Sequence, residues 1–239
     1  MTSSSPLRVM TYNVHSCVGG DRRYDPERIL KVLREIDADI IALQEVGGLM
    51  AGEQEQASFF ADRLGMSVVA GPSLHRRKLP FGNALLVRGE IIDIALVDLT
   101  VMAFAERGAI DCLAETRLGP VRILAAHLGL FAPERRKQIA LIASRLAENP
   151  QPLTVLLGDF NIFGPERRHL QRIGAPMPMP KVRSFPARRP MVSLDRIWTI
   201  PNNRLVRLAA HRTPLTRIAS DHVPLVGTIE PWVETIEAA

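Results

Sequence analysis

Polar side chains stand at the ends of otherwise apolar segments all along this chain of 239 residues. Segments such as TVLLG and IIALQ are apolar enough to form buried strands, and a carboxylate at the end of a buried strand is costly unless a cation compensates it. Loops and strand ends are also where catalytic groups gather in layered α/β proteins. The residues so placed are Asn13 after VMTY, Glu45 after IIALQ, His127 after ILAA, Asp159 and Asn161 after TVLLG, Asp195 within SLDRIW, and Asp221 with His222 before VPLVG.

This set of acids, amides and imidazoles predicts a site for a hard divalent cation. Mg²⁺ prefers oxygen ligands and keeps several of its waters, so one or two carboxylates suffice to hold it. A cation of this kind serves phosphate chemistry as a Lewis acid and as a template.

Each of these residues alone also has a structural interpretation. Asn13 is a common turn residue, and Asp159 in GDFN is typical of an Asx-turn. Glu45 is able to cap the following loop or pair with a surface arginine, and Asp195 stands next to Arg196 as in a simple ion pair. A single histidine is more often a satisfied core or surface residue than a catalyst. The order of the whole set along the chain favours the functional hypothesis.

The elements that must position these residues follow from hydrophobic periodicity. Asp25 and Pro26 predict a helix start, and the apolar stripe that follows predicts one buried helix face. Further helices are expected at Gln54–Leu64, from Pro133 onward, and near Pro165–Ile173. Strands are expected at Leu7–His15, Asp39–Val46, Met66–Ala70, Phe81–Arg88, Ile91–Leu99, Ala109–Arg117, Val121–Leu128, Pro152–Gly158, Ser193–Thr199, Leu205–His211 and His222–Glu230.

Many short strands with a few amphipathic helices predict layered sheets covered by helices. The expected fold is α/β, with two packed, mostly antiparallel sheets and helices on their outer faces. Gly and Pro breaks in the middle of the chain predict antiparallel hairpins there. We expect one domain over residues 1–239, with residues 1–6 as a flexible tail.

Composition adds little about function. The 30 Lys+Arg and 25 Asp+Glu give a net charge of +5, which is compatible with anionic partners and also ordinary for this length. Only Cys17 and Cys112 are present, so reduced thiols are expected. The sequence shows no signal peptide and no apolar run of the roughly 20 residues that a membrane helix needs, so a cytoplasmic protein is expected.

The order of these motifs resembles the endonuclease/exonuclease/phosphatase superfamily, which includes DNase I-like nucleases, sphingomyelinases and inositol polyphosphate phosphatases. The resemblance covers essentially the whole chain. The matching stretches are TYNVH from Thr11, LQEV from Leu43, GNALL from Gly82, AAHLG from Ala125, GDFN from Gly158, SLDRI from Ser193 and SDHVPL from Ser220. The resemblance implies a four-layered αββα sandwich and phosphate-ester hydrolysis with Mg²⁺, or Mn²⁺ in its place.

The resemblance also implies a role for each residue. Glu45 resembles the principal metal-binding carboxylate, with Asn13 beside it and Asp221 as a further metal or network carboxylate. Asp159 resembles the residue that orients or deprotonates the attacking water, and Asn161 the one that holds the phosphate or nucleophile. His222 resembles the histidine on the scissile phosphate, oriented by Asp195. His127 falls where relatives keep a histidine that assists the leaving group.

Two further contacts with substrate phosphate are implied less directly, by Asn83 of GNALL and by Arg135. Arg135 and Gln138 share a helical face with the apolar stripe and so are expected to point inward near His127. The alternative for Arg135 is a solvated helix start. The basic run His75–Lys78 is either a solvated turn or an anion-steering loop.

The substrate is left open between nucleic acid and a phospholipid-type diester. Positive charge favours nucleic acid, whereas two Trp, two Tyr and no interleaved basic and aromatic stretch speak against it. A phosphomonoesterase acting on a small metabolite or inositol phosphate is the alternative, and a catalytically silent binding module is a lower one. No obligate protein partner is evident.

Overall fold

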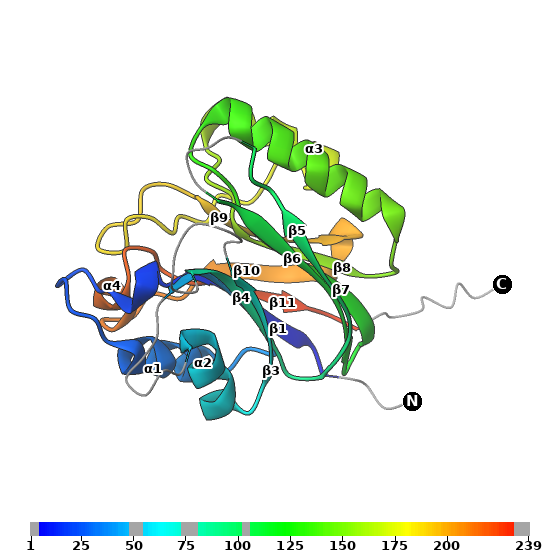
Figure 1. Ribbon diagram of the computed structural model, residues 1–239. Coiled ribbons are helices and arrows are strands. Elements are labelled where there is room, and N and C mark those ends of the chain that lie inside the picture. Colours follow the sequence, from blue (N-terminus) through cyan, green and yellow to red (C-terminus); the bar gives the residue numbers. More distant parts are fainter. Residues whose placement is uncertain (1–4, 48–54, 73–80, 102–105, 232–239) are drawn as a thin grey trace.

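A computed structural model describes residues 5–47, 55–72, 81–101 and 106–231. These residues form two β-sheets that pack face to face, with helices outside both (Figure 1). The six-stranded sheet has the order β10 (Leu205–Ala210), β11 (Leu225–Ile229), β1 (Leu7–Asn13), β2 (Ile40–Gly47), β4 (Phe81–Val87) and β3 (Ser67–Pro72). The five-stranded sheet has the order β5 (Glu90–Asp98), β6 (Gly108–Thr116), β7 (Gly119–His127), β8 (Thr154–Asp159) and β9 (Asp195–Ile200).

The helices lie on the outer faces of this sandwich. Figure 1 shows α1 and α2 outside the six-stranded sheet and α3 outside the five-stranded sheet. Their bounds are α1 (Pro26–Ile36), α2 (Gln56–Leu64), α3 (Ala132–Glu148) and α4 (Thr216–Ala219), with 3₁₀ segments η1 (His15–Cys17), η2 (Gly164–Ile173) and η3 (Asn202–Arg204). The predicted order of layers, helix–sheet–sheet–helix, is confirmed.

Three buried apolar clusters fill the spaces between the layers. One joins α1 and α2 to the six-stranded sheet, the second lies between the two sheets, and the third joins α3 and η2 to the five-stranded sheet. Helix α1 shows how the sequence encodes this packing. The Asp25 side chain accepts the Arg28 amide at 2.9 Å, and the stripe of Ile29, Val32, Leu33 and Ile36 is buried.

Two pairs of neighbouring strands are parallel, β1 with β2 and β7 with β8. Strands that run in parallel end at the same edge of a sheet. Asn13 and Glu45 therefore come together at the end of one pair, and His127 lies opposite Asp159 at the end of the other. All other strand pairs are antiparallel.

The structure corrects the expected elements at several places. The hairpin series does not run through β4 and β5, because these two strands belong to different sheets. Strand β11 begins at Leu225 rather than His222, since Pro224 has no amide hydrogen to donate to a ladder. Gln54, the run His75–Lys78 and residues 1–4 of the expected tail lie outside the described residues. In the described part of the chain, no helix combines the length and apolar character that crossing a bilayer requires.

Candidate functional site

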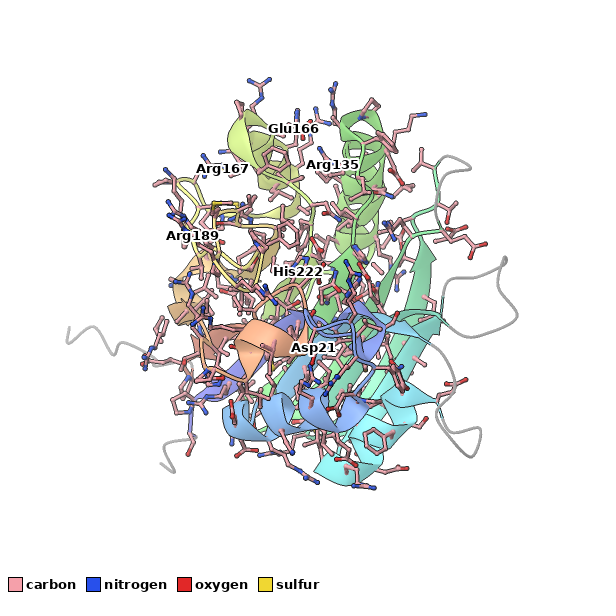
Figure 2. All side chains as sticks on the ribbon, turned by 90° about the vertical axis from the view of Figure 1, so that its left-hand side faces the viewer. Asp21, Arg135, Glu166, Arg167, Arg189 and His222 are labelled. Carbon is pink, nitrogen blue, oxygen red and sulfur yellow. The ribbon has the colours of Figure 1, made fainter. Side chains whose placement is uncertain are left out.

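The two parallel strand pairs, one from each sheet, deliver their polar ends to one edge of the sandwich. Figure 2 looks onto this edge, with His222 near the middle of the face. Asn13, His127, Asp159, Asp195 and His222 are all buried there, and Glu45 is half-buried. The structure thus brings together six side chains that are scattered over most of the sequence.

Asn13 connects the two sheets through a single amide group. Its Nδ2 donates to Glu45 Oε1 at 2.9 Å and to Asp159 Oδ2 at 3.2 Å. The amide cannot rotate freely, because its Oδ1 accepts the backbone amide of His15 at 3.1 Å. Asn13 therefore fixes the spacing of two carboxylates, and the metal contact expected of it stays a prediction.

Glu45 is aimed at the site by an irregularity in β2. The pairing of β2 with β4 shifts register between Leu43 and Val46, and Glu45 has a φ of 56°, in the left-handed region. A bulge of this kind redirects a side chain out of the ladder, and non-glycine residues in the left-handed region concentrate at functional sites.

Asp159 lies at the centre of the site. Its Oδ2 is 3.7 Å from His127 Nε2 and 3.8 Å from His222 Nε2, and its Oδ1 accepts the Asn161 amide at 3.0 Å. The preceding Gly158 has a φ of +148°, and a Cβ there would lie 1.9 Å from the Ala126 carbonyl oxygen. Only glycine lets β8 approach β7 this closely just before Asp159.

Asp195 and His222 form the predicted pair. Asp195 Oδ2 lies 2.7 Å from His222 Nδ1, so Nδ1 donates and Nε2 is turned toward Asp159. Two serines anchor the pair. Ser184 Oγ accepts the Asp195 amide, and Ser220 Oγ accepts the His222 amide while donating to the Asn13 carbonyl at 2.8 Å.

The pKa values of the two histidines that face Asp159 are shifted in opposite directions. Burial tends to lower the pKa of His222, but Asp195, by charge and hydrogen bond, together with Asp159 and Asp221, raises that pKa to about 10. Burial lowers the pKa of His127 to about 4, only partly offset by Asp159. At neutral pH the site therefore holds one charged and one neutral imidazole, a separation typical of acid–base sites.

The pKa of Asp159 is raised above its ordinary value, which makes its carboxylate a stronger base. Burial raises its pKa and the neighbouring Asp195 raises it further, whereas His127, His222 and Asn13 act in the opposite direction. A carboxylate with a raised pKa is a stronger proton acceptor than an exposed one.

Asn161 and Asp221 border the site. Asn161 is buried with a φ of 50°, and its Nδ2 donates to the Leu128 carbonyl at 2.9 Å, which links the loops after β7 and β8. Asp221 is half-buried, and its Oδ1 lies 3.3 Å from Ser220 Oγ. A phosphate contact for Asn161 and a metal contact for Asp221 stay predictions.

The side chains expected on α3 do point inward. Gln138 is buried, accepts the Gly129 amide at 2.8 Å and donates to the Leu99 carbonyl at 2.9 Å. Arg135 is buried as well, and its guanidinium donates to the Gly129 and Leu130 carbonyls and pairs with Glu166. Arg135 thus secures the loop after His127.

Asn83 lies on β4, and its Nδ2 donates to the Gly108 carbonyl at 2.8 Å, a bond from the six-stranded sheet to β6. The bond gives Asn83 a place in holding the two sheets together. The contacts of Asn83 and Arg135 with substrate phosphate stay predictions.

Two groups of side chains are able to hold a cation. Asp159, Asp195 and His222 each bring one ligand atom within 4.8 Å of the others, and this buried group could bind a metal ion. Glu45 with Asn13 offers oxygen atoms only, which suits a hard cation that keeps several waters. Among the described residues, none donates a hydrogen bond to Glu45 Oε2.

The roles of three neighbours of His222 were not predicted from the sequence, although Ser220 opens the matching stretch SDHVPL. Ser184, Ser220 and Phe185 support the His222 pair, with the Phe185 ring centroid 4.9 Å from that of His222. A serine in such a stretch carries no pattern that marks a supporting role. The sequence does contain a repeated pattern at this edge. Phe-(Ala/Gly)-Pro-Glu-Arg-Arg occurs at Phe131–Arg136 and again at Phe163–Arg168.

The chain is similar in sequence or in fold to several known proteins. The sequence profile of the endonuclease/exonuclease/phosphatase family matches residues 10–222. The uncharacterized protein YbhP of Escherichia coli K12 is 27% identical over 248 residues, covering 95% of this chain and 98% of its own. An endonuclease/exonuclease/phosphatase structure from Bacteroides vulgatus has a TM-score of 0.75 at 17% identity, covering 95% of this chain and 100% of that one. The human Nocturnin catalytic domain has a TM-score of 0.70 at 20% identity, covering 93% of each chain.

Proposed function

The chain belongs to the endonuclease/exonuclease/phosphatase family of phosphoesterases, and on that premise we propose that it hydrolyses phosphate diesters by in-line attack of a water molecule, with a divalent metal ion. The observation that supports this most directly is the position of Asp159 Oδ2. One carboxylate oxygen lies within 3.2–3.8 Å of the Asn13 amide and of the Nε2 atoms of both His127 and His222.

Asp159 is the proposed base. Its raised pKa suits proton uptake from a water, and Asn13 and the Asn161 amide hold its two oxygens in place. Because the carboxylate is held from both sides, it is oriented before the substrate arrives, and such preorganisation lowers the barrier.

His222 is the proposed donor to the phosphate. Asp195 fixes the orientation of its ring and stabilises its charged form, so Nε2 carries a proton that can be donated to a non-bridging oxygen. His127, on the neighbouring strand, is neutral. It is placed to donate a hydrogen bond to the leaving oxygen without transferring a proton.

Glu45 and Asn13 are the residues we propose to hold the metal, with Mg²⁺ as the ion and Mn²⁺ as a substitute. When bound, the ion would neutralise charge on the phosphate as a Lewis acid. The Asp159, Asp195 and His222 group is the less suitable of the two sites, because the short bond between His222 Nδ1 and Asp195 Oδ2 already satisfies two of its atoms.

The test is hydrolysis of bis-p-nitrophenyl phosphate with Mg²⁺ or Mn²⁺, with EDTA as the control. Turnover that requires the metal and disappears in Asp159→Asn and His222→Ala supports the proposal. Faster turnover of p-nitrophenyl phosphate would favour the monoesterase alternative. Absence of turnover on both esters, and on plasmid DNA, single-stranded RNA and phospholipid vesicles, would favour a silent binding module.

A further inference from the structure

The repeated pattern lies at the catalytic edge, where the loops after two neighbouring strands lead into helical segments. Its first copy, Phe131–Arg136, follows β7, and its second copy, Phe163–Arg168, follows β8. His127 and Asp159 are paired in register on these parallel strands, and each phenylalanine comes four residues later. Each phenylalanine is also the N-cap of a helical segment, α3 or η2. The fold thus places two copies of one surface element next to each other.

The two copies are linked across the loops. Arg135 of the first copy pairs with Glu166 of the second, and Asn161 donates to the Leu128 carbonyl at 2.9 Å. Figure 2 shows Arg135 and Glu166 above His222 on the same face of the molecule. Because these contacts fix both loops, the side chains they present are held in a defined arrangement beside the site.

Large apolar side chains in these two segments are exposed to solvent. Leu130 is 66% exposed, Phe131 52% and Phe163 60%. We call these three residues the apolar rim. The prolines that follow the two phenylalanines, Pro133 and Pro165, are exposed as well. Exposed apolar side chains that cluster on a soluble protein often mark an interaction site.

Cationic side chains follow the phenylalanine in both copies of the pattern. Arg136, Lys137 and Arg168 are exposed, and Arg167 is half-buried. The two glutamates of the repeated pattern do not balance them, since Glu134 is buried and Glu166 is paired with Arg135. Both copies of the pattern therefore combine exposed apolar side chains with cationic ones.

We propose that the apolar rim and these cations dock the catalytic edge on an anionic phospholipid bilayer. Apolar side chains that enter the headgroup region, backed by Lys and Arg that attract anionic lipid, are the chemistry of interfacial binding. The ester hydrolysed would then belong to a lipid headgroup, and this second part rests on the proposed function.

The observations favour a lipid surface over a nucleic acid. Single strands are held in charged grooves where bases stack on aromatic rings. The most exposed member of the apolar rim is the aliphatic Leu130, which offers no π-face. Leu130 and Phe163 are 66% and 60% exposed, which is more than side chains that line a groove would be.

The test is co-sedimentation with vesicles of phosphatidylcholine alone or mixed with phosphatidylglycerol, in EDTA so that no lipid is hydrolysed. We expect binding to the mixed vesicles, weakened at least about tenfold in the double variant Leu130→Ser/Phe163→Ser. The matched control is Ile92→Ser/Ile94→Ser on β5, whose side chains are 52% and 46% exposed outside the rim, and it should bind like the unmodified protein. Unfolding midpoints of all variants check that they are folded.

A second pair of variants tests the contribution of the cationic side chains to vesicle binding. It also keeps the proposal testable if the Leu130→Ser/Phe163→Ser variant does not fold. Arg136→Gln/Arg168→Gln should weaken binding to the mixed vesicles and reduce its salt dependence. Lys31→Gln/Arg34→Gln, which removes the same charge from the exposed side of α1, should not.

Several outcomes would overturn the proposal. These are no binding to mixed vesicles, equal effects of test and control variants, or a rim variant that loses affinity for oligothymidylate while keeping affinity for vesicles. Hydrolysis of the soluble diester by the unmodified protein separates the two ideas. Turnover without vesicle binding defeats only the docking surface, and vesicle binding without turnover of any ester defeats only the proposed function.

Discussion

Asp195 approaches His222 with one carboxylate oxygen, Oδ2, at 2.7 Å from Nδ1. The other oxygen, Oδ1, is buried and has no hydrogen-bond partner in the described part of the chain. A buried carboxylate oxygen without a partner is costly. The arrangement therefore favours a charged imidazole opposite Asp195, since a positive charge compensates the whole carboxylate.

The first prediction concerns this pair. Asp195→Asn removes the charge that contributes most to raising the pKa of His222, so that pKa should fall, while Asp159 and Asp221 still oppose the effect of burial. We expect turnover at pH 8 to fall roughly 10²–10⁴-fold. Because a lower pKa leaves less of the variant histidine protonated as pH rises, the loss should be smaller at pH 5.5. The check is the pH profile of kcat/KM between pH 5 and 9. An equal loss at every pH would show that Asp195 only maintains the local structure.

The second prediction concerns the amide that joins the two carboxylates. Asn13→Ala removes the donor to both Glu45 and Asp159, so neither side chain keeps its orientation. We expect turnover to fall about 10²-fold or more and the Mg²⁺ concentration for half-maximal activity to rise about tenfold. The control is Thr11→Val. Thr11 lies on the same strand as Asn13, and the substitution removes a hydroxyl that donates to Gln44 of β2. A change in turnover with no change in the Mg²⁺ concentration required would show that Asn13 does not contribute to metal binding.

The third prediction concerns Gly158. Alanine there would place Cβ 1.9 Å from the Ala126 carbonyl oxygen, at a φ of +148°. We expect Gly158→Ala to lower the free energy of unfolding by roughly 2–4 kcal/mol and to reduce activity by moving Asp159 away from His127. Gly65→Ala is the matched control, since Gly65 also has a positive φ but its added Cβ meets nothing within 4 Å. It should cost only about 1 kcal/mol. Urea unfolding measures both variants, and equal costs would contradict the steric argument.

The sequence predicted most of the sandwich and which residues would meet. Apolar stripes and strand-like runs depend on local periodicity, which is why α1 and the strand before Asp159 were predicted within a few residues. The parallel pairing of β7 with β8 depends on contacts between distant segments and could not be predicted from either segment alone. For the same reason, the sequence could not show that β4 and β5 belong to different sheets.

The finer geometry of the site was not predictable from residue types. The sequence indicates that Asn13 and Arg135 are important, but not that one bridges two carboxylates and the other pairs with Glu166. Side-chain direction depends on the bulge at Glu45 and the left-handed backbone at Asn161. Such strained features are set by the surrounding fold rather than by local propensity.

The fourth prediction concerns the thiols. Both cysteines are buried, and burial raises the pKa of Cys17 to about 12 and that of Cys112 to about 11. Because the thiolate is the reactive form, neither should react with Ellman's reagent at pH 8 until the protein unfolds. Above the ordinary value of 9.0, the unfolded chain loses the Cys17 proton while the folded chain keeps it, so stability should fall as pH rises toward 12. Cys17→Ala should make this decline shallower. Rapid labelling of the folded protein would contradict the burial.

The fifth prediction concerns the metal and Glu45. A ligand that binds only the folded state stabilises it by mass action, by about 2.7 kcal/mol at a concentration 100 times its Kd. Adding Mg²⁺ to protein stripped with EDTA should therefore raise the unfolding midpoint. Glu45→Gln preserves the shape of the side chain and an acceptor for Asn13 Nδ2 but removes the charge, so most of that increase should disappear along with turnover.

Asp195→Asn provides the comparison for the metal site. If Glu45 holds the ion, the Asp195 variant keeps the Mg²⁺-dependent rise in the midpoint although it turns over slowly, because Asp195 is bonded to His222 rather than to Glu45. If the ion binds instead among Asp159, Asp195 and His222, Asp195→Asn should lose the Mg²⁺-dependent rise in the midpoint and Glu45→Gln should keep it. Loss of the rise in Asp195→Asn, with the rise retained in Glu45→Gln, would therefore assign the metal to the start of β9 rather than to the end of β2.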